Sequence, residues 1–470
     1  MKRILSLFCL IIILLTFCSC KKNPAKTTSL SDFSSSEVTV SKDNASTESE
    51  ESSSSSKTQS EEGKTDSGIN ENCDHYYRPA TCEKPGICNF CDKIIEPALG
   101  HSFVGAICSR QGCTAKGKNW VDWYKEGNIS ITEAEVEQIL SIQYKKPKNV
   151  IVMIGDGMGP NDIAMTQKIK KGCFDFGLVL NKIKYTGFAT THSYDSNVTD
   201  SAASATALAT GFKTKNGYIG ISPAGEMLTN ISEIARQNGK RIGIVTNDSV
   251  VGATPSGFGV HNISRSNTAE LAKSFVSLKA DVLIGQGYSS FKNLDLSSFL
   301  VANGIEKMNY TLNSDLLCKK PFMGFFSEDT ISKSSNSLAY CTEIALNRLK
   351  NKDKGFFLMV ENTAADVAGH NNVIEGKLNG VVTLDRAVAT VLKFMKDNPD
   401  TLLIITSDHE TGGVKLPEGD YVPDNSFFTT TSHTNTPVRT FAVGYGAEYF
   451  HNKTVDNTDI AKFAIYAVKN

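Results

Sequence analysis

From about residue 147 to the end of the chain, short apolar runs rich in β-branched residues alternate with amphipathic stretches. Strands of a parallel sheet are buried on both faces, so they read as continuous apolar runs, and helices usually connect them. The alternation therefore predicts an α/β fold with a mostly parallel central sheet flanked by helices. The expected strands are residues 149–156, 241–247, 281–287, 355–361 and 401–408.

Four stretches of the chain have the character of helices. Residues 201–210 are rich in alanine, and residues 227–238 and 379–398 carry an amphipathic pattern. Residues 130–143 precede the sheet and begin with the pattern of a capping box, in which Ser130 is followed by Glu133. These stretches supply the helices that a parallel sheet needs.

The composition is that of an ordinary globular protein, with 40% hydrophobic and 21% charged residues. The 470 residues suffice for one large domain with appendages or for two or three domains. Because the formal net charge is -1, the chain has no bulk electrostatic attraction for nucleic acid, and we expect no nucleic-acid binding.

The N-terminus has the pattern of a secretion signal. Lys2 and Arg3 precede an apolar run, residues 5–17, which is shorter than the roughly 20 residues that span a bilayer. Small Ser19 then precedes Cys20, as in a bacterial lipoprotein signal. We expect residues 1–20 to be a lipoprotein signal peptide and Cys20 to be lipidated, with a plain signal peptide as the alternative. The chain would then be exported to the cell envelope, on the periplasmic or extracellular face, and only the lipid anchor would touch the membrane.

Two further segments separate the signal from the sheet-forming body. Residues 21–72 are rich in Ser and Glu and poor in large apolar residues, which predicts a disordered tether. Residues 73–116 predict a small Cys/His-rich module that is too short to build a large core. Either structural zinc or disulfides could staple this module, and the pattern leaves both open. The residues concerned are Cys73, Cys82, Cys88, Cys91, His101, Cys108 and Cys113.

Acidic residues stand where three of the expected strands end. One strand ends in Asp156, another in Glu361, and a third in Asp408 followed by His409. In an open α/β sheet, ligands bind outside the carboxyl ends of the strands, so these side chains should share one edge. Carboxylates gathered there repel one another unless a cation lies between them. The sequence therefore predicts a metal site at this edge.

Other residues of metal-ligand type occur nearby in the sequence. Asp366 and His370 are four residues apart, so one turn of a helix would put both on one face. His433 lies in a polar segment. Histidine and aspartate together suit Zn²⁺, whereas an all-oxygen set suits Mg²⁺.

The stretch NVTDSAASATALATG, residues 197–211, consists mostly of small residues. A tightly packed helix would need such side chains, but Ser201 at the expected helix start could also be a nucleophile. No GxSxG pattern surrounds it, which argues against a nucleophile-elbow hydrolase. The local sequence alone does not say what would activate this serine.

Six stretches occur in the order VIVMIGDGMG, VTDSAASATALATG, GATPSGFGVHNISR, FLMVENTAADVAGH, SDHETGG and SHTNTPV. Together they resemble the alkaline phosphatase family from about residue 147 to the end of the chain. The resemblance implies that residues 117–470 form an alkaline phosphatase-like catalytic domain. It implies metal-dependent hydrolysis of small phosphate monoesters through a phosphoserine intermediate, and it allows a homodimer.

The resemblance also implies a role for each matching residue. Ser201 would be the nucleophile, activated by zinc rather than by a histidine base, and Arg265 would bind the phosphate. Two Zn²⁺ and one Mg²⁺ would bind at each active site. The first zinc would be held by Asp366, His370 and His433, the second by Asp156, Asp408 and His409, and the magnesium by Asp156, Thr254 and Glu361.

The sequence departs from the family pattern at two positions. An Asp or His usually stands two residues before the magnesium-binding Thr, where this chain has Gly252. A Lys or His often follows the zinc-binding Asp, where this chain has Val367. These departures bear on the magnesium site and on the grip on phosphate. The short segment between His409 and His433 also predicts a reduced accessory domain.

Two other functions compete with phosphate monoester hydrolysis. One is a phosphodiesterase or another phosphoryl-transfer enzyme of the same fold. The other is a non-catalytic surface lipoprotein that binds zinc. The presence of the serine, the arginine and all the implied metal ligands favours an enzyme.

Overall fold

The computed structural model describes residues 130–170, 174–303, 320–326, 337–350 and 353–470, together with four short strands between residues 86 and 108. Among the latter, β1 (Gly86–Ile87) pairs with β2 (Ile94–Glu96), and β3 (Phe103–Val104) pairs with β4 (Ile107–Cys108). The expected signal peptide with Cys20, the tether and the cysteine side chains of the module lie outside the described residues. Among the described helices, none combines the length and the apolar character needed to cross a bilayer.

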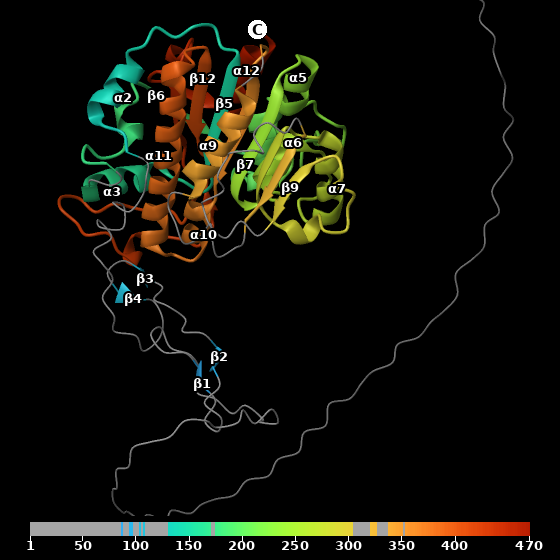
Figure 1. Ribbon diagram of the computed structural model, residues 1–470. Helices are drawn as coiled ribbons and strands as arrows, with labels where there is room; N and C mark the ends of the chain where they lie inside the picture. The colour runs from blue at the N-terminus through green and yellow to red at the C-terminus, as the bar shows by residue number, and fades with distance from the viewer. Residues whose placement is uncertain are drawn as a thin grey trace, which may run out of the picture. The chain divides into compact units, whose positions relative to one another are not determined.

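A ten-stranded sheet forms the centre of the body (Figure 1). All its described pairings are parallel except those on either side of β15, which runs against its neighbours β12 and β6. The α/β fold with a mostly parallel sheet is thus confirmed. In spatial order the strands are β16 (Thr454–Asp456), β6 (Tyr185–Thr190), β15 (Val438–Val443), β12 (Thr401–Thr406), β5 (Asn149–Gly155), β11 (Phe356–Asn362), β7 (Arg241–Ser249), β8 (Val282–Gln286), β10 (Phe322–Phe325) and β9 (Leu300–Asn303).

The five strands expected from the sequence are β5, β7, β8, β11 and β12, and they form one continuous block in the spatial order β12, β5, β11, β7, β8. The other five strands were not predicted. They lie toward the two ends of the sheet and are only three to six residues long. The partly exposed β6 and β9 lack the continuous apolar run that marks a strand buried on both faces.

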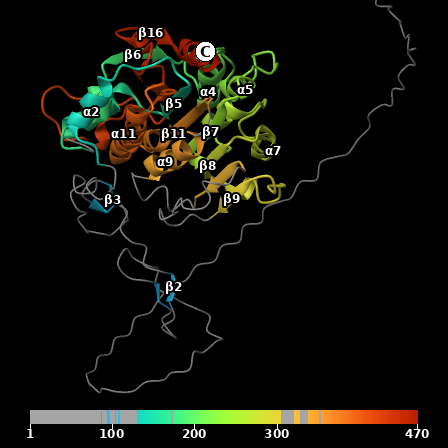
Figure 2. The same ribbon diagram turned by 45° about the horizontal axis from the view of Figure 1, so that its top comes forward.

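Helices cover both faces of the sheet (Figures 1 and 2). One face is covered by α2 (Glu133–Leu140), α9 (Ser337–Leu349) and the long α11 (Ile374–Asp397), and the other by α4 (Ser201–Thr210), α5 (Ile231–Gln237), α6 (Ala253–Gly259), α7 (Thr268–Leu278) and α12 (Asn457–Lys469). The remaining helical segments are α3 (Pro160–Lys170), α10 (Ala364–His370), η2 (Val179–Lys182), η3 (Tyr288–Ser290), η5 (Asn425–Phe427) and η6 (Ala447–Phe450).

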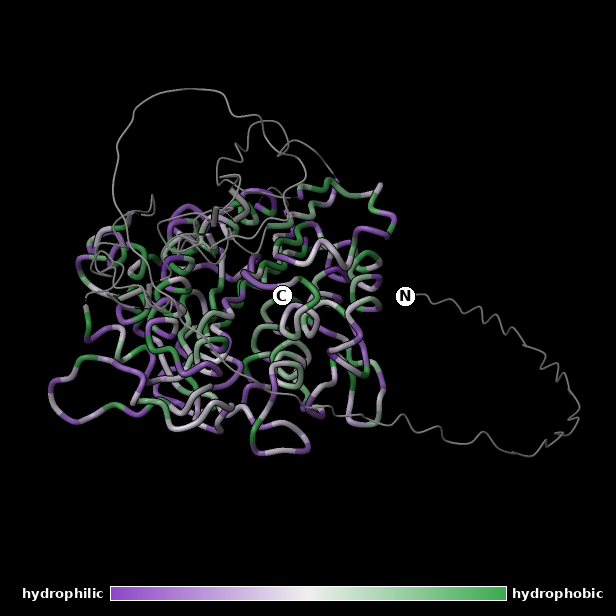
Figure 3. Tube along the Cα trace, turned by 90° about the horizontal axis from the view of Figure 1, so that it is seen from below, coloured by the Kyte–Doolittle hydropathy of each residue, from purple (hydrophilic) through white to green (hydrophobic). Residues whose placement is uncertain are grey.

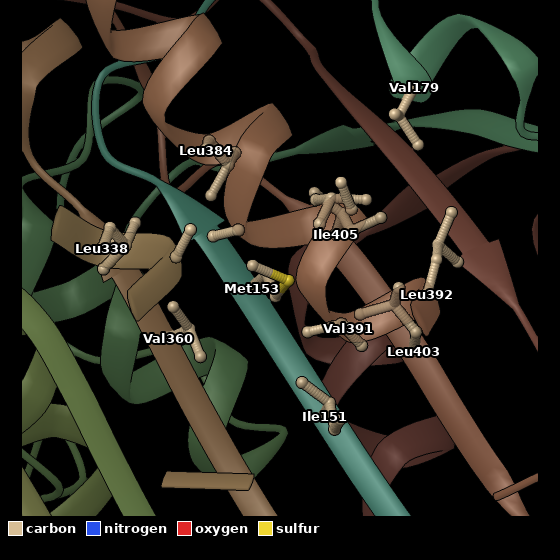
Figure 4. Packing of buried hydrophobic residues seen from close by; sticks show 14 of the residues in the cluster. Ile151, Met153, Val179, Leu338, Val360, Leu384, Val391, Leu392, Leu403 and Ile405 are labelled. Carbon is tan, nitrogen blue, oxygen red and sulfur yellow. The ribbon is translucent and has the colours of Figure 1, made fainter. Parts of the chain in front are cut away.

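The central strand β5 shows how the sequence builds two cores. Ile151 and Met153 join the hydrophobic cluster beneath α9 and α11, where Figure 4 shows Met153 near Ile405 and Ile151 near Val391. Val150, Val152 and Ile154 alternate with them and join the cluster on the opposite face. Burying each such side chain contributes about 1.5–3 kcal/mol, so the sheet is anchored on both faces. Along the helices, apolar and polar residues alternate, as expected where one side of each helix is buried (Figure 3).

The start of α2 corrects one prediction. The capping box is formed by Thr132 and Glu135, not by Ser130 and Glu133. The Thr132 hydroxyl accepts a hydrogen bond from Glu135 N at 3.2 Å, and Glu135 Oε2 accepts one from Thr132 N at 2.8 Å. Ile131 is buried ahead of the cap, so the chain stays extended past Ser130 and the helix begins two residues later than predicted.

Candidate active site

The carboxyl ends of four neighbouring strands form the floor of the site. In the sheet, β12, β5, β11 and β7 are consecutive. Their registers place Thr406 of β12 and Glu361 of β11 beside Ile154 of β5, and Glu361 beside Thr246 of β7. Asp156 and Asp408 follow within two residues of these positions. The sheet thus gathers at one edge the acidic residues that the sequence puts far apart.

Three of these residues form what we call the buried cluster: Asp156, Asp408 and His409. Their ligand atoms lie within 4.8 Å of one another, and all three side chains are buried. His409 Nε2 lies 3.1 Å from Asp408 Oδ2 and 3.6 Å from Asp156 Oδ1. Asp156 Oδ1 and Asp408 Oδ2 are buried and have no hydrogen-bond partner among the described residues. Such unsatisfied buried oxygens are costly unless they bind a ligand.

A second group, the rim cluster, consists of Asp366, His370 and His433, whose ligand atoms also lie within 4.8 Å of one another. Asp366 and His370 come from successive turns of α10, as their spacing predicted. His433 comes from β14 (His433–Thr434), which pairs with β13 (Glu410–Thr411) so that His433 faces Thr411. The His370 side chain is 43% exposed, so this cluster opens to solvent.

Backbone carbonyls fix the orientation of both rim histidines. His370 Nδ1 lies 2.7 Å from the carbonyl oxygen of Thr431, and His433 Nδ1 lies 2.9 Å from that of Thr199. Because a carbonyl can only accept, each Nδ1 carries a proton, and the two Nε2 atoms face each other 3.1 Å apart. Two neutral rings would bring lone pairs into contact there. This arrangement is the usual way that second-shell groups aim histidines at a metal ion.

Thr411 connects the two clusters. Its hydroxyl donates to Asp366 Oδ1 at 2.5 Å and lies 3.2 Å from His409 Nδ1. Since the hydroxyl has one proton, and the carboxylate takes it, the hydroxyl accepts from His409 Nδ1. His409 therefore presents the lone pair of Nε2 to the buried cluster. This role of Thr411 was not predicted. The only sign of it in the sequence is the position of Thr411 directly after the strand-end segment.

Ser201 lies against the buried cluster at the first position of α4. Asp200 caps the helix, since its side chain accepts a hydrogen bond from Ala203 N. The Ser201 hydroxyl is 3.3 Å from His409 Nε2 and the side chain is buried. One turn on, the Ser204 hydroxyl donates to the carbonyl oxygen of Asp408 at 2.7 Å and so fastens α4 to the strand-end segment. The small residues of α4 are all buried, as close packing requires.

Arg265 reaches the same place from the segment after α6. Its Nη1 lies 3.1 Å from Asp200 Oδ2, and its side chain is 40% exposed. The same carboxylate oxygen accepts a hydrogen bond from Gly217 N at 3.0 Å. Asp200 thus caps the serine's helix and holds the arginine beside it, a role that the sequence analysis did not assign.

Glu361, Thr254 and Asp156 form a third group, which we call the hydroxyl–carboxylate group. Thr246 of β7 donates to Glu361 Oε2 at 2.6 Å and so fixes this carboxylate. Oγ1 of Thr254 is buried and has no hydrogen-bond partner among the described residues. Oxygen ligands alone suit a hard cation such as Mg²⁺.

With this geometry established, comparison with known proteins decides the family. The sequence model described as alkaline phosphatase matches residues 147–297 and 306–430. The chain belongs to the alkaline phosphatase family. It is 36% identical over 314 residues to alkaline phosphatase 4 of Bacillus subtilis, an alignment that covers 60% of this chain and 67% of that protein. The body of the chain is therefore a phosphomonoesterase of this family.

Solved structures of alkaline phosphatases have the same fold. The enzyme from the Antarctic bacterium TAB5 is 30% identical, with a TM-score of 0.61 over 70% of this chain and 99% of that chain. A variant of that enzyme in which a histidine is replaced by glutamate is described with Mg bound in its M3 site, and it has the same identity, TM-score and coverage.

The charges of this alkaline phosphatase site strongly perturb one another. Burial, together with the negative charges of Asp408, Asp366 and Glu361, raises the pKa of Asp156 well above its usual range. Burial, with Asp248 and Asp408, raises the pKa of Glu361 to about 8. Although burial opposes it, the neighbouring His433 and His409, when protonated, lower the pKa of Asp366. Perturbations of this kind are typical of functional sites.

A buried ion pair supports the segment that carries Asp156. Lys377 and Asp162 are both fully buried and lie 3.0 Å apart. Lys377 also donates to the carbonyl oxygen of Gly157 at 2.8 Å. Gly157 has a φ of +68°, and a Cβ there would lie 2.5 Å from the Cα of Asp366. Only glycine lets the β5 end approach α10 this closely, which explains the glycine after Asp156.

Proposed function

We propose that the chain hydrolyses phosphate monoesters in two displacements through a phosphorylated Ser201, with two Zn²⁺ and one Mg²⁺ bound. The observation that carries the proposal is that one set of three metal-ligand side chains contacts the Ser201 hydroxyl through His409, and a second set of three lies directly against the first. Small phosphate monoesters are the substrates that this arrangement supports.

The donor sets fit the proposed metals. Aspartate and histidine nitrogen suit Zn²⁺ in the buried and rim clusters, and the hydroxyl–carboxylate group suits Mg²⁺. Three oxygen atoms of these groups are buried and have no hydrogen-bond partner among the described residues. They are Asp156 Oδ1, Asp408 Oδ2 and Thr254 Oγ1. The magnesium described in the third site of the TAB5 variant supports the same assignment. When bound, the ions supply positive charge that stabilises an oxyanion nucleophile and leaving group.

The chain's own residues would then act in sequence. The Ser201 oxygen attacks phosphorus, a bond forms between serine and phosphate, and the substrate alcohol leaves with its ester oxygen. Water next attacks the phosphoserine and restores the Ser201 hydroxyl as inorganic phosphate leaves. Arg265 is placed by Asp200 to donate to two phosphate oxygens. Ser201 is also the first residue of α4, and the N-terminus of a helix favours an anion.

The contact between Ser201 and His409 also resembles a serine with a histidine base. His409 Nε2 cannot do both jobs, because the nitrogen that would accept the serine proton is the one that faces Asp156 and Asp408. Two unpartnered carboxylate oxygens beside it favour the ligand role. Activity that survives complete metal removal would support the base role instead.

Ser201→Ala tests the proposal with para-nitrophenyl phosphate as substrate. The variant should lose activity by on the order of 10⁴-fold or more, because the nucleophile is gone. Ser204→Ala is the matched control from the next turn of α4, and it should stay within about tenfold because only one hydrogen bond is lost. Chelation should abolish the wild-type activity. Full zinc-dependent activity in Ser201→Ala would refute the phosphoserine route.

We also propose that the chain is exported and anchored to the cell envelope through a lipid on Cys20. The basic start, the short apolar run and the small residue before the cysteine support this location. A tethered hydrolase would act on phosphate esters outside the cytoplasm. The homodimer and the choice between zinc and disulfides in residues 73–116 stay predictions.

A further inference from the structure

A further acidic residue, Asp248, lies two residues after Thr246, which is paired with Glu361 in the sheet. Its backbone N donates to Thr246 Oγ1 at 3.1 Å, while that same hydroxyl donates to Glu361. The side chain of Gln286 donates to the carbonyl oxygen of Asn247 at 2.8 Å, which ties the segment to β8. Asp248 is therefore held at a fixed place beside the hydroxyl–carboxylate group and not on a loose loop.

The turn that follows Asp248 excludes a side chain at residue 252. Gly252 N donates to the carbonyl oxygen of Ser249 at 2.7 Å, which closes a tight turn. A Cβ on Gly252 would lie 2.8 Å from that carbonyl oxygen, closer than real Cβ atoms approach backbone, and 3.8 Å from Asp248 Oδ2. The Asp248 carboxylate thus touches the place from which a side chain of residue 252 would start.

Geometry connects Asp248 to the hydroxyl–carboxylate group. Its backbone N shares the Thr246 hydroxyl with Glu361, and its carboxylate lies beside residue 252, two residues before Thr254. Thr254 Oγ1 and Asp156 Oδ1 are buried and have no hydrogen-bond partner among the described residues, so both atoms are available to a cation. Asp248 itself is exposed, whereas Glu361 and Thr254 are buried. Mg²⁺ usually keeps several of its waters, and an exposed carboxylate can bind them.

We propose that Asp248 holds the water shell of the divalent cation at the hydroxyl–carboxylate group, in place of the side chain that Gly252 lacks. This inference rests on the proposed magnesium site. The outer carboxylate, which the family pattern puts at residue 252, would come from four residues earlier in the chain. Asp248 acts as a positioning residue, since it reaches the ion through water.

The test is the affinity for Mg²⁺ of the zinc-loaded full chain, measured by isothermal titration with MgCl₂. Asp248→Asn should weaken Mg²⁺ binding by roughly 10-fold to 100-fold, the usual cost of losing an outer-shell partner, without changing the zinc content. The matched control is Asp397→Asn, an exposed aspartate at the end of α11, where the chain returns to the amino edge of the sheet. The control should bind Mg²⁺ like the wild type.

A second variant guards against a folding defect. Asp248→Glu retains the carboxylate, so it should bind Mg²⁺ more tightly than Asp248→Asn, and the thermal unfolding of both variants without Mg²⁺ should match the wild type. Equal Mg²⁺ affinity in Asp248→Asn and the wild type overturns the inference. A wild type that hydrolyses phosphate esters but binds no Mg²⁺ also overturns the inference, while the proposed hydrolysis stands. If instead the Ser201→Ala variant refutes the phosphoserine route, the Mg²⁺ titration still tests the role of Asp248.

Discussion

The buried cluster and the rim cluster have similar ligands in opposite surroundings. Asp156, Asp408 and His409 are all buried and follow directly from β5 and β12 in the middle of the sheet. Of the rim residues, His370 is exposed, while Asp366 and His433 are only partly buried. Burial is therefore the larger difference between the two sites. An ion in the buried cluster would be held by the rigid sheet, whereas an ion at the rim would be within reach of water and substrate.

The two clusters are nonetheless in direct contact. The rings of His409 and His433 stack with their centroids 3.6 Å apart, and Thr411 hydrogen-bonds a ligand of each cluster. The short β13–β14 pairing brings His433 to this place from a polar segment. The site therefore combines a rigid half, suited to hold the nucleophile, with an open half, suited to receive a leaving group and then water.

The largest expected difference between the clusters is in rescue by added zinc. Asp408→Asn and His370→Ala should each lower the rate by on the order of 10³-fold, because each removes a ligand to a metal worth several kcal/mol. Millimolar zinc should restore His370→Ala by roughly tenfold or more through mass action, since water can replace an exposed ligand. Zinc should not restore Asp408→Asn, whose site is closed. Activity titrated against zinc, with bound metal measured by mass spectrometry, checks this, and equal rescue of both variants would contradict the comparison.

Thr411→Val sharpens the comparison because it cuts the link between the clusters. The variant should bind zinc roughly 10-fold to 100-fold more weakly at both clusters, as the loss of a second-shell partner does elsewhere. Thr429→Val is the control, since that hydroxyl donates to the carbonyl oxygen of Gly413 and has no hydrogen bond with a cluster residue in the described part of the chain. Competition with a fluorescent zinc chelator measures both affinities. A weakened rim cluster beside an unchanged buried cluster would show that Thr411 serves only Asp366.

The smallest expected effect is on the pH dependence of the metal-free chain. The pKa of Glu361 is raised from 4.5 to about 8, mainly by burial, and those of Asp156 and His433 are raised as well. A raised pKa means that the folded state binds the proton more tightly than the unfolded state. The stability that these three groups contribute is therefore present near pH 5 and is lost as the pH rises toward 8.

Thermal unfolding of the chelated chain from pH 5 to pH 8 measures this effect. The Tm should fall by several degrees. With zinc and magnesium restored the fall should shrink, because the ions take the place of the protons. A metal-free Tm that stays level or rises over this range would show that the carboxylates are not forced together as the fold places them.

Much of the fold follows from local pattern. The five strands with continuous apolar runs were predicted within about two residues, because a strand buried on both faces has no polar positions to blur it. Helix α4 begins at Ser201 and ends before Gly211, as its composition predicted, and Gly211 adopts the left-handed conformation that ends it. The strands β6, β9 and β16, which lie at or next to the edges of the sheet, were missed because a partly exposed strand carries a weaker signal. The capping box was placed two residues early because the burial of Ile131 is a tertiary property.

The candidate site divides in the same way. The rule that strand ends meet at one edge of a parallel sheet was enough to group Asp156, Glu361, Asp408 and His409. Resemblance supplied the membership of the two sets of three. Neither source pointed to Thr411, Lys377 or Asp248, or to the pairing of Asp200 with Arg265. Each of these residues acts through a contact with a residue far away in the sequence.

The sequence by itself determined which residues of ligand type exist and on which ends of which elements they stand, because hydrophobic periodicity and strand length are local properties. Only the tertiary structure decided which lone pairs face one another, which oxygens are buried without a partner, and that His409 lies 3.3 Å from Ser201. Those facts depend on sheet order and register, which are set by packing on both faces at once. A serine without a histidine near it in the sequence thus acquires one in space, together with the carboxylates that would hold a metal beside it.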